Sequence, residues 1–281
     1  MEDTGIRINK YLSEAGVCSR READRQIEAG NVRIDEKTAV AGDRVRAGQK
    51  VFYRGKRVSR EEEVILLAVN KPVGIVCTAE KREKNNIVDF INYPKRIYPV
   101  GRLDKDSEGL ILMTNQGEIV NKIMRSGNLH EKEYIVTIDR EATPAFLRGM
   151  ANGVPLEELH ATTRKCPVRK LGRNQFQIIL TQGMNRQIRR MCEYFGCHVK
   201  KLKRVRIMNI CLGSLETGKY RSVTEEEKRE LYRLISDSSS GPVVSERAVP
   251  ERKRKHKNGC GGWNGSRKKN RTVERDTGIS Q

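Results

Sequence analysis

The sequence predicts an α+β protein with two folded domains followed by a basic tail. Residues 6–54 show two short amphipathic helices and then short alternating strands. Residues 64–235 alternate strands with helices, and the strands outnumber the helices. Residues 236–281 carry almost no periodic apolar positions. Two folded domains fit the length of 281 residues, since a domain usually takes ~100–200 residues.

The composition favours a soluble protein that meets a polyanion. Lys and Arg number 56 against 36 Asp and Glu, which gives a net charge of +20. A chain this basic most often binds nucleic acid, although a merely solvated basic surface is the alternative. No stretch approaches ~18 uncharged apolar residues, and no apolar run follows the first charges as in a signal peptide. We therefore expect a cytoplasmic protein without membrane association.

Cysteines and phosphate-binding motifs argue against metals and cofactors. The seven cysteines are odd in number, are scattered, and form no CxxC pair, which favours reduced thiols over a disulfide or zinc framework. Neither GxGxxG nor GxxxxGK[ST] occurs, so NAD, FAD and ATP chemistry has no support. We expect no metal and no cofactor.

The first module reads as a helix-turn-helix layout followed by strands. The segment 6–17 places Ile8, Leu12 and Ala15 on one face of a helix. Ser19 and Glu22 have the spacing of a capping box, which predicts a second helix ending at Gly30. Short strands follow around residues 32–34 and 51, and the polar stretch 55–63 reads as a linker.

Three arginines lie on this second helix: Arg20, Arg21 and Arg25. Arg21 and Arg25 are four residues apart and therefore share a face. Such a face is usually only solvated. The strands that follow favour RNA binding instead, because the whole segment resembles the S-four-type RNA-binding domain.

The second domain begins with a continuous apolar run, VILLAVN (64–70), which predicts a buried central strand. Further strands are predicted at 110–115, 132–139 and 176–182, and a helix is predicted at 116–127. A helix at 185–196 presents an apolar face at i, i+3, i+4 and i+7. A second capping-box match, Thr224 with Glu227, predicts a last helix ending near residue 235.

The segment PVGRLDKDSEGLILMTN (99–115) holds the strongest candidates for chemistry. It runs from a glycine-rich charged loop into an apolar strand and contains Asp104, Asp106 and Glu108. A carboxylate pair can serve general acid and base catalysis, whereas an isolated Asp-x-Asp more often only satisfies a turn. Arg102 flanks the loop as a candidate RNA contact.

A second cluster of basic residues lies on the helix at 185–196. Arg186, Arg189 and Arg190 are expected opposite the apolar face, where like charges call for carboxylates or phosphates nearby. A solvated helix face is the alternative.

Tyr134 lies in the middle of the strand at 132–139, with Lys132 on the same face. A tyrosine in that position is usually part of the core. It also fits an aromatic ring that stacks on a nucleic-acid base beside a cation.

Four motifs occur in a fixed order: NKPVGIVCT (70–78), GRLDKDSEGLILMTNQG (101–117), KEYIV (132–136) and QGMNRQIRRM (182–191). In these motifs the chain resembles the RsuA/RluB/RluE/RluF-type pseudouridine synthases, with most likeness to the RluF branch, which acts on large-subunit 23S ribosomal RNA. The resemblance implies an S-four-type domain at 6–54 and a synthase domain at 64–235. It also implies that the synthase domain holds a mixed, mostly antiparallel sheet flanked by helices.

The resemblance also implies roles for single residues. Asp104, the Asp of GRLD, takes the place of the catalytic aspartate, with Asp106 in support. Tyr134 takes the place of the base-stacking tyrosine, and Arg189 that of the ion partner of the aspartate. Arg102, Lys132, Arg186 and Arg190 then belong to the RNA-binding surface, as do the arginines of the second helix. Met184 stands where many relatives have arginine, which leaves one phosphate contact in doubt.

The implied reaction isomerises uridine to pseudouridine without oxidation or hydrolysis, so it requires no cofactor. The target base must leave its stack, which costs a few kcal/mol. The aspartate could attack the anomeric carbon or remove the ribose 2′ proton, and the residues do not separate these routes. Leu103, Ile75 and Leu110 could exclude water, although core packing is their alternative duty.

Competing hypotheses are a non-catalytic RNA-binding or ribosome-assembly protein on the same scaffold, and a synthase that acts on small-subunit or transfer RNA. A glycosidase with two carboxylates would call for an acidic sugar cleft, which the charge balance disfavours. The expected partner is ribosomal RNA, and nothing in the sequence calls for more than a monomer.

The tail at 236–281 holds 11 Lys and Arg residues against five acidic ones. Its composition predicts disorder, because it cannot bury enough apolar surface to offset its chain entropy. A chain shortened to end at Ser236 is therefore expected to keep full pseudouridine-forming activity in a tritium-release assay. Inactivity of the shortened chain would contradict a dispensable tail.

Overall fold

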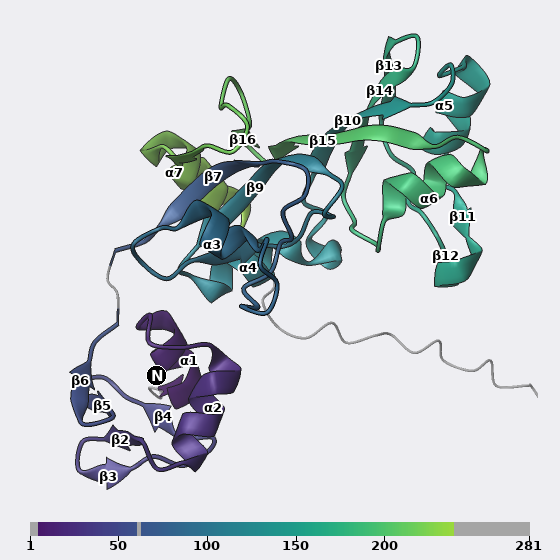
Figure 1. Ribbon diagram of the computed structural model, residues 1–281. Helices are drawn as coiled ribbons and strands as arrows, with labels where there is room; N and C mark the ends of the chain where they lie inside the picture. Colours follow the sequence, from purple (N-terminus) through teal and green to yellow (C-terminus); the bar gives the residue numbers. More distant parts are fainter. Residues whose placement is uncertain (1–4, 61–62, 239–281) are drawn as a thin grey trace, which may run out of the picture. The chain divides into compact units, whose positions relative to one another are not determined.

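The computed structural model of the protein describes residues 5–60 and 63–238 (Figure 1). The chain begins with a small N-terminal part. Its helices and strands are β1 (Ile6–Arg7), α1 (Ile8–Glu14), α2 (Arg20–Glu28), β2 (Val32–Ile34), β3 (Lys37–Thr38), β4 (Arg44–Val45), β5 (Val51–Tyr53) and β6 (Lys56–Val58).

The two helices and the small sheet of this part share one apolar core. Ile8 and Leu12 of α1 are buried against Ala23 and Ile27 of α2 and Val51 of β5. The order of the strands in the sheet is β3-β2-β5-β6. The helix-then-strand layout that the sequence predicts is therefore present.

The N-cap of α2 is as predicted, because the Ser19 side chain accepts a hydrogen bond from the Glu22 N–H at 3.2 Å. The linker prediction for 55–63 is wrong in part. Residues Lys56–Val58 form β6, which pairs antiparallel with β5. The reason is a turn around Arg54 and Gly55, both at positive φ, which returns the polar chain along the edge of the sheet.

The larger part follows from residue 63. Its first half contains β7 (Leu66–Lys71), α3 (Ile87–Ile91), β8 (Tyr98–Val100), β9 (Glu108–Thr114), α4 (Gly117–Met124), the 3-10 helix η1 (Ser126–Asn128) and β10 (Lys132–Ile138). Its second half contains α5 (Pro144–Ala151), β11 (Pro155–Leu156), η2 (Glu157–Leu159), β12 (Ala161–Thr162), β13 (Val168–Gly172), β14 (Gln175–Leu180), α6 (Gln187–Tyr194), β15 (Val199–Ile207), β16 (Ile210–Cys211), β17 (Tyr220–Ser222) and α7 (Glu225–Leu234).

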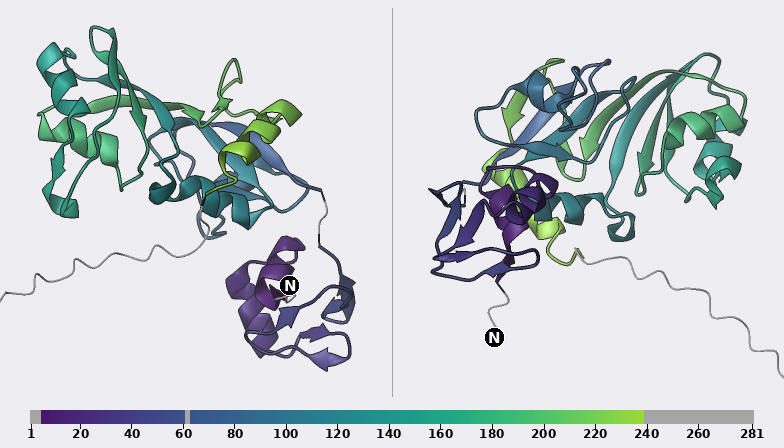
Figure 2. Two further views of the ribbon diagram at one scale, coloured as in Figure 1. Left: turned by 180° about the vertical axis from the view of Figure 1, so that it is seen from behind. Right: turned by 60° about the horizontal axis from the view of Figure 1, so that its bottom comes forward.

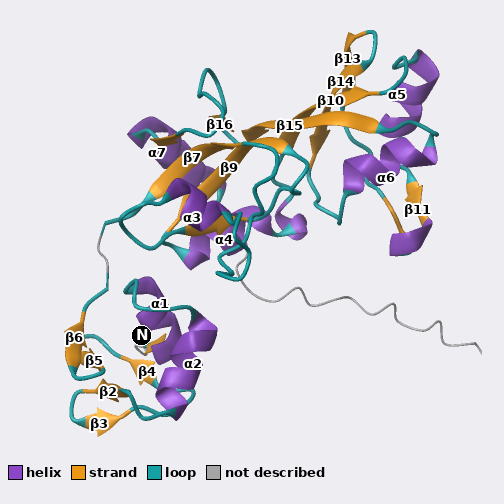
Figure 3. Cartoon of the chain, viewed as in Figure 1, coloured by secondary structure: helices purple, strands orange, loops and turns teal. Residues whose placement is uncertain are grey.

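Nine strands form one sheet with the main order β13-β14-β10-β15-β9-β7-β17, while β16 pairs with β15 and β8 with β9. The pairings are antiparallel except for β9 with β15, which run parallel. Helices flank the sheet, as Figures 2 and 3 show. The expected α+β domain with a mixed, mostly antiparallel sheet is confirmed.

The half of the sheet around β7 and β9 is covered on both faces. Leu66 and Leu112 point into a core that α4 and α7 complete, whereas Leu67 and Ile111 point into a core that α3 completes. Burial on both faces explains why the segment 64–70 reads as an uninterrupted apolar run.

The half around β10 and β14 packs against α5 and α6, which lie together at this end of the sheet (Figure 3). Phe176 of β14 and Phe146 of α5 meet edge to face, with ring centroids 5.4 Å apart. On α6, Ile188, Met191 and Cys192 are buried as the predicted apolar face requires.

The last helix carries a complete capping box. The Thr224 side chain accepts from the Glu227 N–H, and the Glu227 carboxylate accepts from the Thr224 N–H. The helix ends at Leu234, close to the predicted residue 235. Within the described ranges 5–60 and 63–238, no helix has the length and apolar character needed to cross a bilayer. The predicted tail lies outside the described residues from 239 onward.

The two halves of the sheet meet where β9 runs alongside β15. Two residue pairs make this parallel contact: Glu108 with Lys203, and Gly109 with Arg204. Gly109 has φ +103°, and a Cβ built on it would lie 2.3 Å from the Arg204 carbonyl oxygen. Only glycine therefore fits this point of the motif at 101–117.

We expect Gly109→Ala to lower the free energy of unfolding by about 2 kcal/mol or more, because the methyl group forces the two strands apart at a positive φ. Chemical denaturation measures this change. Gly127→Ala is the matched control, since a Cβ at Gly127 meets no atom within 4 Å. Equal stability of the two variants would show that the strands tolerate the added methyl group.

Candidate active site

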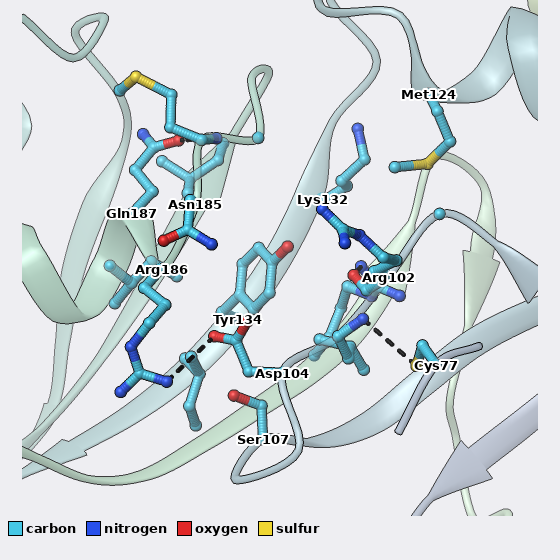
Figure 4. A pocket seen from close by; sticks show the side chains of 18 of the residues that line it. Cys77, Arg102, Asp104, Ser107, Met124, Lys132, Tyr134, Asn185, Arg186 and Gln187 are labelled. Atoms are coloured by element: carbon cyan, nitrogen blue, oxygen red, sulfur yellow. Dashed lines mark hydrogen bonds and ion pairs between the residues drawn. The ribbon is translucent and has the colours of Figure 1, made fainter. Parts of the chain in front are cut away.

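A cavity of about 530 Å³ opens on the sheet where its two halves meet. It is lined by residues from six separate stretches of the chain. These are the segment 76–78, the loop 101–107, Met124 of α4, strand β10, the segment 180–188, and Leu202 with Arg204 of β15. Asp104, Tyr134, Lys132, Arg102 and Arg186 all face this space (Figure 4). The structure thus assembles five of the site residues that the sequence predicts.

Asp104 lies in a turn that closes just before β9. The Ser107 N–H donates to the Asp104 carbonyl oxygen at 3.1 Å, and the Leu103 N–H donates to Cys77 Sγ at 3.4 Å. Gly74 N–H also donates to the Lys105 carbonyl oxygen at 2.7 Å. The loop is therefore fixed to the 70–78 motif on both sides of Asp104, and the Asp104 side chain keeps 33% of its surface exposed to the cavity.

The arginine partners of the two aspartates differ from the expectation. Arg189 Nη2 lies 3.2 Å from Asp106 Oδ2 and donates to the Asp106 carbonyl oxygen at 3.0 Å. Arg186 Nη1 approaches Asp104 Oδ2 to 3.9 Å and donates to both carboxylate oxygens of Asp106 at 3.3 Å. The expected pairing of Arg189 with Asp104 is thus replaced by Arg189 with Asp106, and Arg186 is the arginine beside Asp104.

The local backbone explains this difference. Arg186 precedes α6 in a left-handed conformation with φ +50°, which directs its side chain toward the loop that carries both aspartates. The sequence predicts Arg189 on the face of α6 opposite the apolar face, but its side chain is buried. It also donates to the Ser107 hydroxyl and the Val199 carbonyl oxygen. Its charge therefore holds the base of the loop and the start of β15.

Tyr134 lies near the start of β10, opposite Ile178 of β14 and Arg204 of β15. Its ring is half-buried and packs against the cores of both halves of the sheet. In Figure 4 the ring stands in the middle of the cavity beside the Asp104 carboxylate. This placement puts the Tyr134 ring inside the cavity that Asp104 also lines.

Lys132 is buried, with 4% of its surface exposed, and its ammonium donates to the His130 carbonyl oxygen at 3.1 Å. Burial, and then the positive charge of Arg204, lower the pKa of Lys132 to about 8. Lys132, which is expected among the RNA contacts, is therefore a cation at the inner wall of the cavity.

Two further buried cations, Arg204 and Lys71, were not predicted from the sequence. Arg204 lies in the segment VKKLKRVRI (199–207), whose many charges resemble a solvated strand. Lys71 is fully buried and donates to the carbonyl oxygens of Pro72 and Ile75, both at 2.8 Å. Its place in the NKPVG motif was the one available signal.

The remaining predicted RNA contacts lie on the surface. Arg20, Arg21 and Arg25 are exposed on α2, and Arg25 pairs with Glu22. Arg190 pairs with Glu158 and donates to the Asn185 carbonyl oxygen at 3.2 Å. Arg190 is therefore turned toward η2 and the start of its own helix.

Three residues were proposed to exclude water. Leu103 lines the cavity and also belongs to an apolar core, whereas Leu110 is buried in a core and Ile75 packs against one. Met184 lines the cavity as well. Six described cysteines are free thiols, and the described residues hold no group of three or more His, Cys, Asp or Glu side chains placed to bind a metal ion.

Comparison with known proteins defines the class of this chain. Residues 65–194 match the RNA pseudouridylate synthase family, and residues 6–51 match the S4 domain. The chain belongs to the RNA pseudouridylate synthase family and is an isomerase that acts on RNA.

Among individual proteins, the chain is 53% identical to the dual-specificity RNA pseudouridine synthase RluF of Escherichia coli (strain K12) over 253 residues, 89% of this chain and 87% of that protein. It is 35% identical to the ribosomal large subunit pseudouridine synthase B of Bacillus subtilis (strain 168), over 81% of this chain and 96% of that protein. A crystal structure of a pseudouridylate synthase superposes with a TM-score of 0.60 at 26% identity, covering 81% of this chain and 100% of that one. The resemblance to the RluF branch is confirmed.

We expect Lys132→Met to be more stable than the wild-type protein by about 1–3 kcal/mol below pH 8, because a buried charge is replaced by an apolar side chain of similar length. The folded-state pKa of Lys132 is lowered to about 8 from 10.5. Between these values the unfolded chain holds the proton that the folded chain has released, so the wild type gains stability as pH rises.

The difference between the two proteins should therefore be largest below pH 8 and shrink toward pH 10.5, as thermal melts at several pH values would measure. Lys201→Met on the exposed side of β15 is the control and should show no such trend. A constant difference at every pH would mean that the charge of Lys132 is not the cause.

Proposed function

We propose that this protein converts a uridine of large-subunit ribosomal RNA to pseudouridine, with Asp104 as the catalytic group. The observation that carries the proposal is the cavity in which Asp104 lies beside Tyr134 and is surrounded by cations. The names of the similar proteins, a dual-specificity synthase and a large-subunit synthase, support this class of substrate.

The cavity suits a single base that has left its stack. A uracil ring that stacks on Tyr134 would bring its ribose within reach of the Asp104 carboxylate, and unstacking would cost a few kcal/mol. Arg186 Nη1 lies 3.9 Å from Asp104 Oδ2 and so places a positive charge beside this carboxylate. Leu103 and Met184 line the cavity with apolar surface and limit the access of water to the reacting carbon.

Asp104 can act in two ways. Its carboxylate either attacks the anomeric carbon as N1 departs, or it removes the 2′ proton of the ribose. Both routes need an ionised carboxylate near the sugar and a site that retains the free base. Tyr134 would also take part when the proton leaves carbon 5.

The N-terminal part would hold the rest of the RNA. The exposed arginines of α2 present positive charge without a built pocket, so they would contact phosphates and contribute little sequence selectivity. A second RNA class, such as transfer RNA, is the alternative that the dual-specificity name supports. The cytoplasmic location and the monomeric state stay predictions.

Asp104→Asn is expected to lower the single-turnover rate of pseudouridine formation by about 10²–10⁴-fold, with RNA affinity nearly unchanged, because the charge that performs the chemistry is lost. Tritium release from labelled RNA measures the rate. Asp106→Asn is the matched variant on the same loop, and it should weaken the Arg186 and Arg189 pairs without abolishing activity. An active Asp104→Asn variant beside an inactive Asp106→Asn variant would exchange their roles.

The substrate is identified by mapping pseudouridines in ribosomal RNA from cells with and without the gene, using carbodiimide and primer extension. The loss of one signal in the large subunit is the expected result. The loss of a small-subunit signal instead would overturn the substrate assignment. Full function of the Asp104→Asn variant in ribosome assembly would favour the binding role over the catalytic one.

A further inference from the structure

The inner wall of the cavity carries a cation with an unused donor. Arg204 is 1% exposed, and its Nε donates to the Leu110 carbonyl oxygen at 2.7 Å while Nη1 donates to the Arg102 carbonyl oxygen at 3.5 Å. Its Nη2 is buried and finds no hydrogen-bond partner among the described residues. An unsatisfied buried guanidinium donor is costly, so its retention calls for an explanation.

An irregularity in the sheet directs this side chain into the cavity. Along β10 and β15, Glu133 pairs with Arg206 but Tyr134 pairs with Arg204, so Val205 is the extra residue of a bulge. Residues that pair directly across two strands point to the same face. The bulge therefore places Arg204 on the face of Tyr134, inside the cavity that both residues line.

Lys132 adds a second cation on the same wall. It precedes Tyr134 by two residues on β10, it lines the same cavity, and one of its three ammonium donors is used by the His130 carbonyl oxygen. Gln182 Nε2, also in the cavity lining, is buried without a partner among the described residues. Asp104 lines the same space, but the arginine beside it is Arg186. Two charged donors and one amide donor thus remain for a ligand.

The chemistry of these donors favours carbonyl oxygens over phosphate. Arg204 and Lys132 are at most 4% exposed, deeper than a phosphate joined to two riboses would readily reach. A planar base stacked on Tyr134 carries its carbonyl groups at its edge, where an amide donor such as Gln182 is also well matched.

We propose that Arg204 and Lys132 bind the carbonyl oxygens of the detached uracil and stabilise its negative charge while it turns. This inference rests on the proposed function. When the bond from C1′ to N1 breaks, N1 leaves with the electron pair, and the charge spreads by conjugation to O2 and O4. Carbon 5 then gives an electron pair to C1′, its proton leaves, and N1 takes up a proton. The net change is one proton moved from carbon 5 to N1, with no oxidation.

The test compares RNA that carries uridine, 2-thiouridine or 4-thiouridine at the modified position. Sulfur accepts hydrogen bonds more weakly than oxygen, so a site that binds a carbonyl oxygen should distinguish the thio-substrates. Single-turnover rates at saturating RNA are measured for the wild type and Lys132→Met. We expect the variant to lose about 10- to 100-fold with uridine and clearly less with one of the thiouridines.

That change in the rate ratio is a coupling between one side chain and one substrate atom, which a merely structural role would not produce. Lys105→Met, on the exposed rim of the cavity, is the control and should leave the ratio unchanged. Arg204→Lys, which keeps the charge but loses the fork, should show the same coupling as Lys132→Met. Melting curves identify any variant that fails to fold, and Lys132→Met carries the test if Arg204→Lys unfolds.

Equal losses on all three substrates would overturn the inference while leaving the proposed function intact. A weaker RNA affinity with an unchanged rate at saturation would also overturn it, because the lysine would then bind phosphate. The proposed function fails separately, if the wild type forms no pseudouridine in ribosomal RNA.

Discussion

The short parallel contact between β9 and β15 is the constraint on which the rest of the structure depends. Two residue pairs join a half-sheet covered on both faces to a half-sheet that packs against α5 and α6. Because Gly109 of β9 lets the Arg204 backbone of β15 approach closely, and Arg204 pairs with Tyr134 of β10, the Asp104 loop that precedes β9 lies near Tyr134 and Lys132. The cavity is a consequence of this junction.

The charged residues around the cavity have two different roles: some hold the loop in place, and others face the cavity. Asp106 is held by Arg186 and Arg189 and anchors the loop, so Asp104 is left with an exposed face toward the cavity. The cations divide in the same way into one that holds the protein together and two that face the cavity. Arg189 lies outside the cavity lining and its two terminal nitrogens donate to protein oxygens, although its buried Nε has no partner among the described residues. Arg204 and Lys132 line the cavity and keep donors that no described residue uses. Charges that maintain the shape of the site are thereby separated from charges available to a ligand.

The sequence predicted features that depend on neighbouring residues, such as helix caps and a buried strand. It missed features that depend on the three-dimensional path of the backbone, such as ion-pair partners and a bulge. The Ser19 and Thr224 caps follow from residue spacing, and the buried β7 follows from its unbroken apolar run. The partner of Arg189 was missed because the left-handed backbone of Arg186, just before α6, is not visible in the sequence. Arg186 lies beside Asp104, and Arg189 pairs with Asp106. Arg204 was missed because a bulge breaks the alternation by which a strand face is read.

The cavity draws its walls from residues as far apart in the chain as Cys77 and Arg204. Neither half of the sheet contains a working fragment of the site, since Asp104 belongs to one and Tyr134 to the other. On the proposed mechanism, a partly folded chain would lack one of the two residues and would leave the glycosidic bond intact. If Asp104 acts as proposed, cooperative folding protects the RNA, because this carboxylate and the walls of the cavity are assembled together.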